Sequence, residues 1–447
     1  MNRKPKKIFL NFKLFDGIQD GLQENKIILV SHERIEKIEE SSELKGYREY
    51  EIVDLKGQIL LPGFIDAHLH ITVPFIFKTN RDAFFQMNRQ LELNFSNCIK
   101  YGVTTIRDVG AFPRKINRWR KKINRKEAAG PRILTTTSFI TSHGGVPEMA
   151  PTLNFFEELV AGGQFVERIG SPEEAVRVGN RLIDQGADWL KTQYSEESFL
   201  FHGPLKTLSD KTLMALRKVS KERGIRLAMH HTEAAGFRKG IQIGVDTLEH
   251  SAATPLKQED VERFVAGDMA IVPTLKVFGD NFEIEELLNW LENEGKDDFM
   301  PEPLRQSIRE VKKLLRKPYP PPDYMDKFYS DIAFFRKAYP VAIQNVEKIR
   351  AAGGKIGVGT DTCGTGLSFF GFYWKELKHL THAGFSNYEA LTAATSVNAE
   401  IIGMEKDVGS ISPGKYADFI LLSGNPLENI EEAKNINAVI KGGEKIL

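Results

Sequence analysis

The chain has 447 residues, well above the ~100 to 200 residues of a typical domain, so it holds either several modules or one large barrel with additions. Its content of 41% hydrophobic and 27% charged residues excludes disordered, collagen-like and membrane-spanning chains. The 61 Lys and Arg residues balance 60 Asp and Glu residues, so the net charge of +1 gives no general attraction to nucleic acid or to an anionic membrane.

The N-terminus and the cysteines bear on the cellular compartment. Residues 1–10 are basic, but too few apolar residues follow for the core of a signal peptide, and no apolar run approaches the ~20 residues of a membrane span. Cys98 and Cys363 cannot build a disulfide framework in a chain of this length, and the sequence has no Cys-x-x-Cys motif. We therefore expect a cytoplasmic protein.

Short β-rich runs alternate with helical patterns between about residues 59 and 400, which predicts parallel βα units. The helical segments, such as 171–186 and 209–224, begin at a serine cap and end at glycine. Eight strands are predicted, the number that closes a (β/α)8 TIM barrel. These strands are 59–70, 103–110, 132–140, 189–195, 225–231, 246–251, 269–275 and 355–362.

The two ends of the chain differ from this middle part. They hold short apolar runs separated by Gly, Asp, Asn and Pro, which is typical of strands joined by turns. Because both ends flank the barrel, we expect them to form one small composite β-domain, with two separate appendages as the alternative. The predicted domains are residues 1–60 plus 405–447 for the β-domain and 61–404 for the barrel, with an insertion at about 276–336 that either covers the active site or lies on the surface.

The strongest local signal is the pair His68 and His70 at the end of the first predicted barrel strand. Residues two apart on a strand point to the same face, so both side chains can bind one metal ion, although a simple pair of hydrogen-bonded histidines is the alternative. His230 and His231 end the fifth strand, His250 lies in the sixth and Asp361 ends the eighth. All of them lie where a barrel collects its catalytic groups, at the C-terminal ends of strands.

Imidazoles and carboxylates without thiolates suit zinc, iron or manganese. Such an ion would lower the pKa of a bound water from 15.7 in bulk toward ~7 and polarise a scissile carbonyl. Asp361 could then take the proton of the water and pass it to the leaving nitrogen. The residues therefore predict a hydrolytic metal site.

Five motifs make the chain resemble the amidohydrolase superfamily, within it the branch of imidazolonepropionase-like and Xaa-Pro-dipeptidase-like enzymes. The motifs are LPGFIDAHLH ending at His70, GVTTIRDVG at 102–110, GVDTLEH ending at His250, GTD ending at Asp361 and GSISPGKYADF at 409–419. The resemblance covers almost the whole chain. It implies a barrel with a small β-sandwich completed by the C-terminal strands.

The resemblance also implies a two-metal site with zinc as the favoured ion. In it His68 and His70 hold the more buried ion, His230 and His250 hold the other, and Asp361 binds the first ion while handling the proton. Lys191 matches the lysine that the family carboxylates to bridge both ions, with a bridging hydroxide as the nucleophile. From the residues alone Lys191 is a strand-end salt-bridge lysine, because a free ammonium cannot bind a cation.

The remaining site assignments concern one ligand and the substrate. Neighbouring strand residues face opposite ways, so one of His230 and His231 reaches the metal. The spacing of twenty residues between His230 and His250 matches the family pattern, so we expect His230 to be the ligand. His231 would then have a packing or supporting role. Three further side chains are candidate substrate contacts, each with a structural role as the alternative. They are His143, Tyr194 and His202. The order His143-Gly-Gly, and Thr232 where some dipeptidase relatives carry a tyrosine, depart from the family pattern.

These observations predict a metal-dependent amidohydrolase that cleaves a C–N bond of an amide, a small peptide as dipeptidases and prolidases do, or a cyclic amide. The alternatives are a single-metal deaminase of the same superfamily with an unmodified Lys191, and a non-catalytic scaffold protein. The expected partner is a small-molecule substrate. The eight basic residues in 114–126 are typical of a solvated helix face, so no nucleic-acid or membrane partner is expected, and no feature fixes the order of a homo-oligomer.

Overall fold

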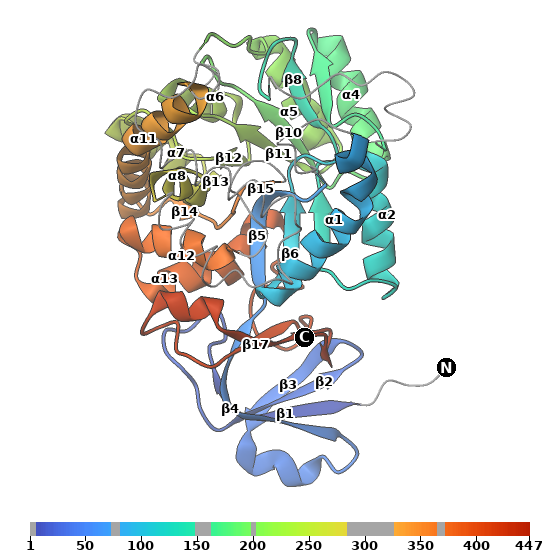
Figure 1. Cartoon of the computed structure of the whole chain (residues 1–447). Coiled ribbons are helices and arrows are strands. Elements are labelled where there is room, and N and C mark those ends of the chain that lie inside the picture. Colours follow the sequence, from blue (N-terminus) through green and yellow to red (C-terminus); the bar gives the residue numbers. More distant parts are fainter. Residues whose placement is uncertain (1–5, 73–80, 148–161, 198–202, 284–325, 364–371) are drawn as a thin grey trace.

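A computed structural model describes residues 6–72, 81–147, 162–197, 203–283, 326–363 and 372–447. Strands from both ends of the chain join in one seven-stranded sheet, which lies below the α/β part of the molecule in Figure 1. Its strands are β1 (Lys7–Leu14), β2 (Lys26–Ser31), β3 (Arg34–Glu40), β4 (Glu51–Pro62), β16 (Phe419–Leu422), β17 (Ile436–Lys441) and β18 (Glu444–Lys445). They are ordered β18-β17-β16-β4-β1-β2-β3.

β4 connects the two ends, because it pairs in parallel with β1 on one side and antiparallel with β16 on the other. Alternate residues of these strands turn apolar side chains to a common core, in which the rings of Phe9 and Phe419 lie edge to face at 5.7 Å. The expectation that the apolar runs of both chain ends form strands of one β-domain is met by this sheet. The division of this sheet into the two layers of a sandwich, and the domain boundaries, stay predictions.

The α/β part contains short strands whose pairings are all parallel. They are β5 (Phe64–His70), β6 (Val103–Asp108), β7 (Arg132–Thr135), β8 (Phe139–Ser142), β9 (Val166–Ile169), β10 (Trp189–Gln193), β11 (Arg226–His230), β12 (Thr247–Glu249), β13 (Ala270–Val272), β14 (Lys355–Ile356) and β15 (Thr362–Cys363). Hydrogen bonds order them as β10-β11-β12-β13-β14, β15-β5-β6-β7 and β8-β9. The predicted parallel arrangement is confirmed, and the closure of eight strands into a complete barrel stays a prediction.

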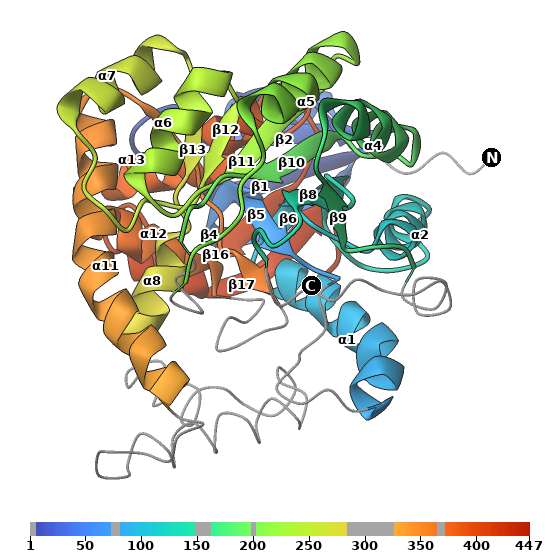
Figure 2. The ribbon, with the colours of Figure 1, turned by 90° about the horizontal axis from the view of Figure 1, so that it is seen from above.

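Helices surround these strands when the molecule is seen from above (Figure 2). The α-helices are α1 (Arg81–Lys100), α2 (Pro113–Asn124), α4 (Pro172–Asp184), α5 (Asp210–Glu222), α6 (Ala234–Ile243), α7 (Gln258–Ala266), α8 (Leu275–Phe282), α11 (Asp326–Ala351), α12 (Tyr373–His382), α13 (Asn387–Thr392) and α14 (Asn398–Ile402). A π-helical turn (Ala393–Val397) joins the last two, and two 3-10 helices lie at Ser41–Gly46 and Ile430–Lys434. The serine caps predicted for α4 and α5 are confirmed, since Ser171 and Ser209 each accept a hydrogen bond from a first-turn backbone N–H.

Three predicted strands are each divided, and the other five are shorter than predicted. The run at 59–70 divides into β4 and β5 at Gly63, where a Cβ atom would lie 2.1 Å from Thr104 Oγ1, so the chain can pass from one sheet to the other only without a side chain. The run at 132–140 divides into β7 and β8, and β9 was not predicted. The run at 355–362 is a strand only at its two ends, β14 and β15, and the left-handed Asp361 immediately precedes the second.

The predicted insertion at 276–336 begins within α8 and ends within α11, and its residues 284–325 lie outside the described residues. The basic run at 114–126 lies along α2 and the turn after it, where Arg120 pairs with Asp188 at 2.7 Å and Lys126 pairs with Glu33. In the part of the chain that the structure describes, every helix is too short or too polar to cross a bilayer.

Candidate metal centre

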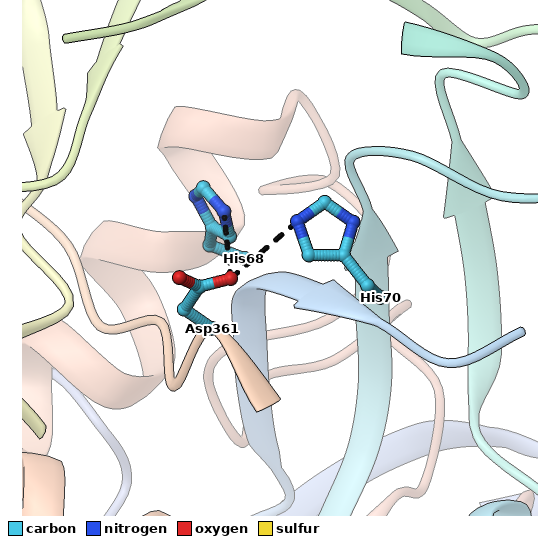
Figure 3. Close-up of side chains that lie close together, drawn as sticks. All are labelled: His68, His70 and Asp361. Carbon is cyan, nitrogen blue, oxygen red and sulfur yellow. Dashed lines mark ion pairs between the residues drawn. The ribbon is translucent and has the colours of Figure 1, made fainter. Parts of the chain in front are cut away.

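Three predicted metal ligands meet at the ends of β5 and of the 355–362 run. Nε2 of His68 and Nε2 of His70 each lie 3.4 Å from Oδ1 of Asp361, as Figure 3 shows. One potential ligand atom from each side chain lies within 4.8 Å of the other two. Two imidazole nitrogens and a carboxylate at this spacing form a possible divalent-metal site.

The local backbone explains how Asp361 reaches the two histidines. His68 and His70 share a face of β5 because they are two residues apart. Asp361 lies in the left-handed region with φ of 47°, which few non-glycine residues adopt, and its N–H donates to the carbonyl of His68 at 2.7 Å. Asp66 accepts hydrogen bonds from the N–H and the hydroxyl of Thr360 and so holds the preceding residue. These contacts offset the strain and turn the Asp361 carboxylate toward the histidines.

His230 and His250 adjoin this group from β11 and from the end of β12. The centroid of the His250 ring lies 4.7 Å from that of His68 and 4.5 Å from that of His230. His250 also adopts a left-handed conformation, with φ of 74°, and its Nδ1 lies 2.8 Å from Thr274 Oγ1 and 3.8 Å from Asp361 Oδ2. The structure therefore brings the four predicted histidines and Asp361 into one cluster.

Lys191 lies on β10, opposite Ala228 in the register with β11, and its amine points into the same buried region. Its side chain is 1% exposed, its Nζ has no hydrogen-bond partner among the described residues, and the ring of Phe139 lies 5.8 Å away. Burial lowers the pKa of Lys191 from the ordinary 10.5 to about 7. The amine is therefore far easier to deprotonate than a surface lysine.

Buried polar atoms without partners test whether these residues suit a metal ion. Such atoms are rare in folded proteins and usually indicate a missing ligand or water. Three of them belong to the cluster and come from three different strands: His68 Nε2, Lys191 Nζ and His230 Nε2. Burial also lowers the pKa of His70 to about 4 and holds the pKa values of His230 and His250 well below their ordinary range, so these imidazoles are neutral and can donate lone pairs. The residues fit a divalent metal.

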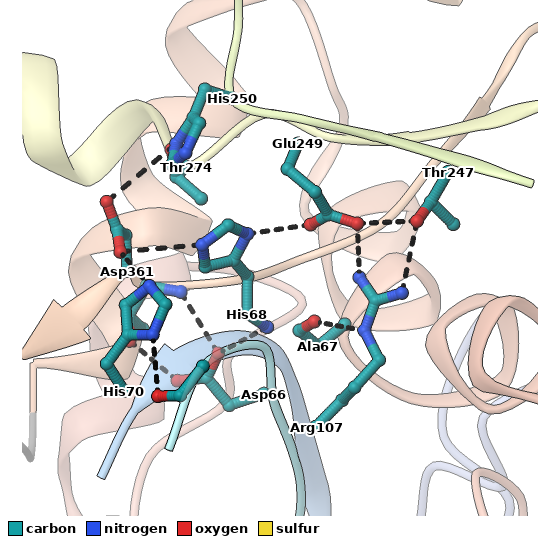
Figure 4. Close-up of polar contacts among 12 residues, drawn as sticks. Asp66, Ala67, His68, His70, Arg107, Thr247, Glu249, His250, Thr274 and Asp361 are labelled. Carbon is teal, nitrogen blue, oxygen red and sulfur yellow. Dashed lines mark hydrogen bonds and ion pairs between the residues drawn. The ribbon is translucent and has the colours of Figure 1, made fainter. Parts of the chain in front are cut away.

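A buried ion pair that was not predicted supports His68 from behind. Glu249 places Oε2 at 2.6 Å from His68 Nδ1, while its Oε1 accepts a hydrogen bond from the guanidinium of Arg107 at 2.8 Å (Figure 4). Arg107 also donates to the carbonyl of Ala67 at 2.6 Å, and both charged side chains are completely buried. One signal could have revealed this pair: Arg107 and Glu249 are charged residues within predicted barrel strands, where a buried charge occurs only when it is paired.

The predicted substrate contacts that the structure describes do not join the cluster. His143 is exposed in the turn after β8, and the Tyr194 hydroxyl donates to Glu196 at 2.9 Å. His231 is completely buried, its Nδ1 lies 3.1 Å from the carbonyl of Glu249 and its ring packs against Phe237 of α6. His202 lies outside the described residues. Within those residues, none of these side chains makes a hydrogen bond or ion pair with the cluster side chains.

Comparison with known proteins assigns most of the chain to one family. The model of the amidohydrolase family matches residues 59–446. A 5-methylthioadenosine/S-adenosylhomocysteine deaminase of Bacillus cytotoxicus is 23% identical over 450 residues, which cover 94% of this chain and 85% of the relative.

Two solved structures share the fold of this chain. The crystal structure of a Xaa-Pro dipeptidase with bound methionine has a TM-score of 0.75 at 24% identity and covers 98% of this chain and 99% of its own. The structure of molinate hydrolase has a TM-score of 0.76 at 17% identity, and the match covers 100% of this chain and 95% of molinate hydrolase. These neighbours imply a TIM-barrel-like domain, and the resemblance inferred from the sequence motifs is confirmed. The chain belongs to the amidohydrolase family and is a hydrolase that acts on carbon–nitrogen bonds.

Proposed function

We propose that this protein hydrolyses the C–N bond of an amide, a small peptide or a cyclic amide with the help of two divalent ions. The observation that carries the proposal is the convergence of four histidines, Asp361 and the unpartnered amine of Lys191 in one buried cluster. As an ammonium, the Lys191 amine would be buried without a compensating hydrogen bond from any of the described residues, which is energetically unfavourable.

Each side chain has a defined task in this proposal. His68, His70 and Asp361 would hold one ion, and His230 and His250 would hold the other. Zinc suits this set of nitrogen and oxygen donors. When bound, the ions would supply an activated water at neutral pH and polarise the scissile carbonyl. Asp361 would accept the proton of the attacking water and deliver it to the leaving nitrogen.

Lys191 decides between the two-ion centre and its alternative. Its lowered pKa of about 7 leaves a substantial fraction of neutral amine, the form that reacts with carbon dioxide, and the resulting carbamate would provide two oxygens for bridging. The alternative is a single-ion deaminase with unmodified Lys191. It is favoured by the named deaminase relative, which aligns with 94% of this chain.

Metal analysis of the purified protein, loaded in the presence of bicarbonate, tests the proposal. We expect two zinc ions per chain and release of an amine from at least one member of a panel of dipeptides, N-acyl amino acids and cyclic amides. One ion per chain with release of ammonia from an aminopurine nucleoside would favour the deaminase. A protein that binds no ion and remains inactive after metal is supplied would refute both.

A further inference from the structure

Thr274 links the candidate metal centre to a helix outside it. This residue follows β13, is completely buried, and adopts the left-handed conformation with φ of 47° and ψ of 45°. That conformation is a genuine outlier for a β-branched residue. Its Oγ1 lies 2.8 Å from Nδ1 of His250. If His250 binds an ion through Nε2, Nδ1 must carry the proton and donate it to Thr274.

Thr274 is also the residue that precedes the first turn of α8, a position at which threonine usually caps a helix with its own hydroxyl. Here the hydroxyl is turned to His250, and the side chain of Thr274 makes no capping hydrogen bond. The buried carboxylate of Glu376, on α12, caps the helix instead. Its Oε1 accepts from the N–H of Leu275 at 3.0 Å, and its Oε2 accepts from the N–H of Lys276 at 2.5 Å.

A second polar contact joins the same two helices. Asp280, on α8, accepts hydrogen bonds from Lys276 of its own helix and from Lys375 of α12, the latter at 3.3 Å. All three side chains are at least nine-tenths buried. Because buried charges are strongly destabilising without their partners, this contact fixes the separation of α8 and α12.

α12 is anchored in turn to β5, the strand that carries His68 and His70. The hydroxyl of Tyr373, in the first turn of α12, donates to the carbonyl of Ile65 on β5 at 2.7 Å. The Tyr373 ring stacks on Phe64 with centroids 5.0 Å apart. Helix α12 therefore contacts both β5, which holds His68 and His70, and the start of α8, which adjoins His250.

We propose that Glu376 is a positioning residue of the metal centre: by capping α8 it releases the Thr274 hydroxyl to orient His250 relative to the ligands on β5. This inference rests on the proposed function, because it assumes that His250 is a metal ligand. Glu376 itself touches neither the ligand side chains nor the reacting atoms.

A double-mutant cycle tests the path from Glu376 through Thr274. Glu376→Gln and Thr274→Val, which keeps the branched shape and removes the hydroxyl, should each weaken zinc binding and lower kcat by about 10-fold. Since both act through one hydrogen bond, the double variant should also lose about 10-fold rather than about 100-fold. Zinc affinity is measured by competition with a chelator, without substrate, and kcat on the zinc-loaded enzyme.

Glu389→Gln is the matched control, because Glu389 also caps a helix, α13, but lies away from the cluster. It should lower the unfolding temperature as Glu376→Gln does and leave zinc affinity unchanged. Additive losses in the cycle, or Glu376→Gln with the zinc affinity of the wild type, would overturn the inference. Absence of zinc binding by the wild type would instead overturn the proposed function on which it rests.

Discussion

His68 and Glu249 form a hydrogen bond of 2.6 Å between two completely buried side chains, and this bond decides which nitrogen of His68 faces the cluster. Burial disfavours the charge of Glu249, but Arg107, Lys191 and His68 together hold its pKa well below the ordinary range. An ionised carboxylate only accepts hydrogen bonds, so Nδ1 of His68 is the donor in this bond and Nε2 is the nitrogen that faces the cluster.

Replacing Glu249 by Gln should therefore weaken metal binding, and it should also lower the unfolding temperature because the buried Arg107 loses its partner charge. The amide keeps the shape of the side chain but loses the negative charge that makes His68 a stronger donor. We expect zinc affinity to fall by about 10-fold to 100-fold, measured by chelator competition. Glu174→Gln, a change of the same kind at the cap of α4, serves as the control. Wild-type affinity in Glu249→Gln would contradict the role assigned to the pair.

Asp361→Asn should abolish turnover while leaving the fold intact. The amide can neither accept the proton of an attacking water nor offer a full charge to an ion, and general-base catalysis alone is worth about 100-fold to 10,000-fold in rate. The left-handed conformation of residue 361 is well tolerated by asparagine, so the unfolding temperature of the metal-free variant should match that of the wild type. Activity within a few-fold of the wild type would exclude Asp361 as the proton carrier.

Lys191→Met should reduce the metal content from two ions to one and leave the metal-free fold at least as stable. The folded-state pKa of Lys191 is about 7 against 10.5 ordinarily, so between these values the unfolded chain binds more protons and stability of the metal-free protein rises with pH. Methionine removes this dependence. Metal analysis and urea unfolding at pH 7 and pH 9 measure both effects, and a variant that still binds two ions would show that Lys191 is no ligand.

His230 and His231 should behave differently when each is replaced by asparagine. His230→Asn removes the unpartnered Nε2 and should lower the metal content. His231→Asn should keep it, because the asparagine amide can occupy the position of Nδ1, which lies 3.1 Å from the Glu249 carbonyl. Metal analysis of the two variants side by side decides the question, and the reverse pattern would assign the ligand to His231.

Acid should destabilise the protein partly through His379, which lies outside the metal centre. Burial lowers the pKa of this histidine from 6.5 to about 3, so between these values the unfolded chain binds more protons and stability is lost as the pH falls. In the wild type the Tyr339 hydroxyl lies 2.8 Å from Nδ1 of His379. In His379→Asn the asparagine amide retains a partner for this hydroxyl, and the titrating imidazole is removed.

His379→Asn should reduce the pH dependence of the unfolding free energy by about 1.4 kcal/mol per pH unit between pH 4 and 6. Near pH 8 the pH dependence should be the same in the variant and the wild type. Urea unfolding of the metal-free protein across this range provides the measurement. Parallel curves for variant and wild type from pH 4 to 8 would mean that His379 does not contribute.

The cluster was predictable because its residues lie at the ends of strands. His68, His70 and His250 stand in motifs whose β pattern places them at one edge of a parallel sheet, and strand alternation separates His230 from His231. Lys191 entered only through the family resemblance, because nothing in its local sequence distinguishes it from other lysines. Its burial and its lack of a partner become visible only in the folded chain.

The amino-acid sequence by itself determined the parallel strands, the capped helices α4 and α5, and the histidines and Asp361 of the cluster, because periodicity, caps and motifs are local properties of the chain. The tertiary structure alone decided the pairing of Arg107 with Glu249 and the capping of α8 by Glu376. These partners are 142 and about 100 residues apart along the chain, and no local pattern records which buried charge will meet which partner. Their positions follow from burial, since a charge removed from water must find its partner wherever the packing of strands and helices places one.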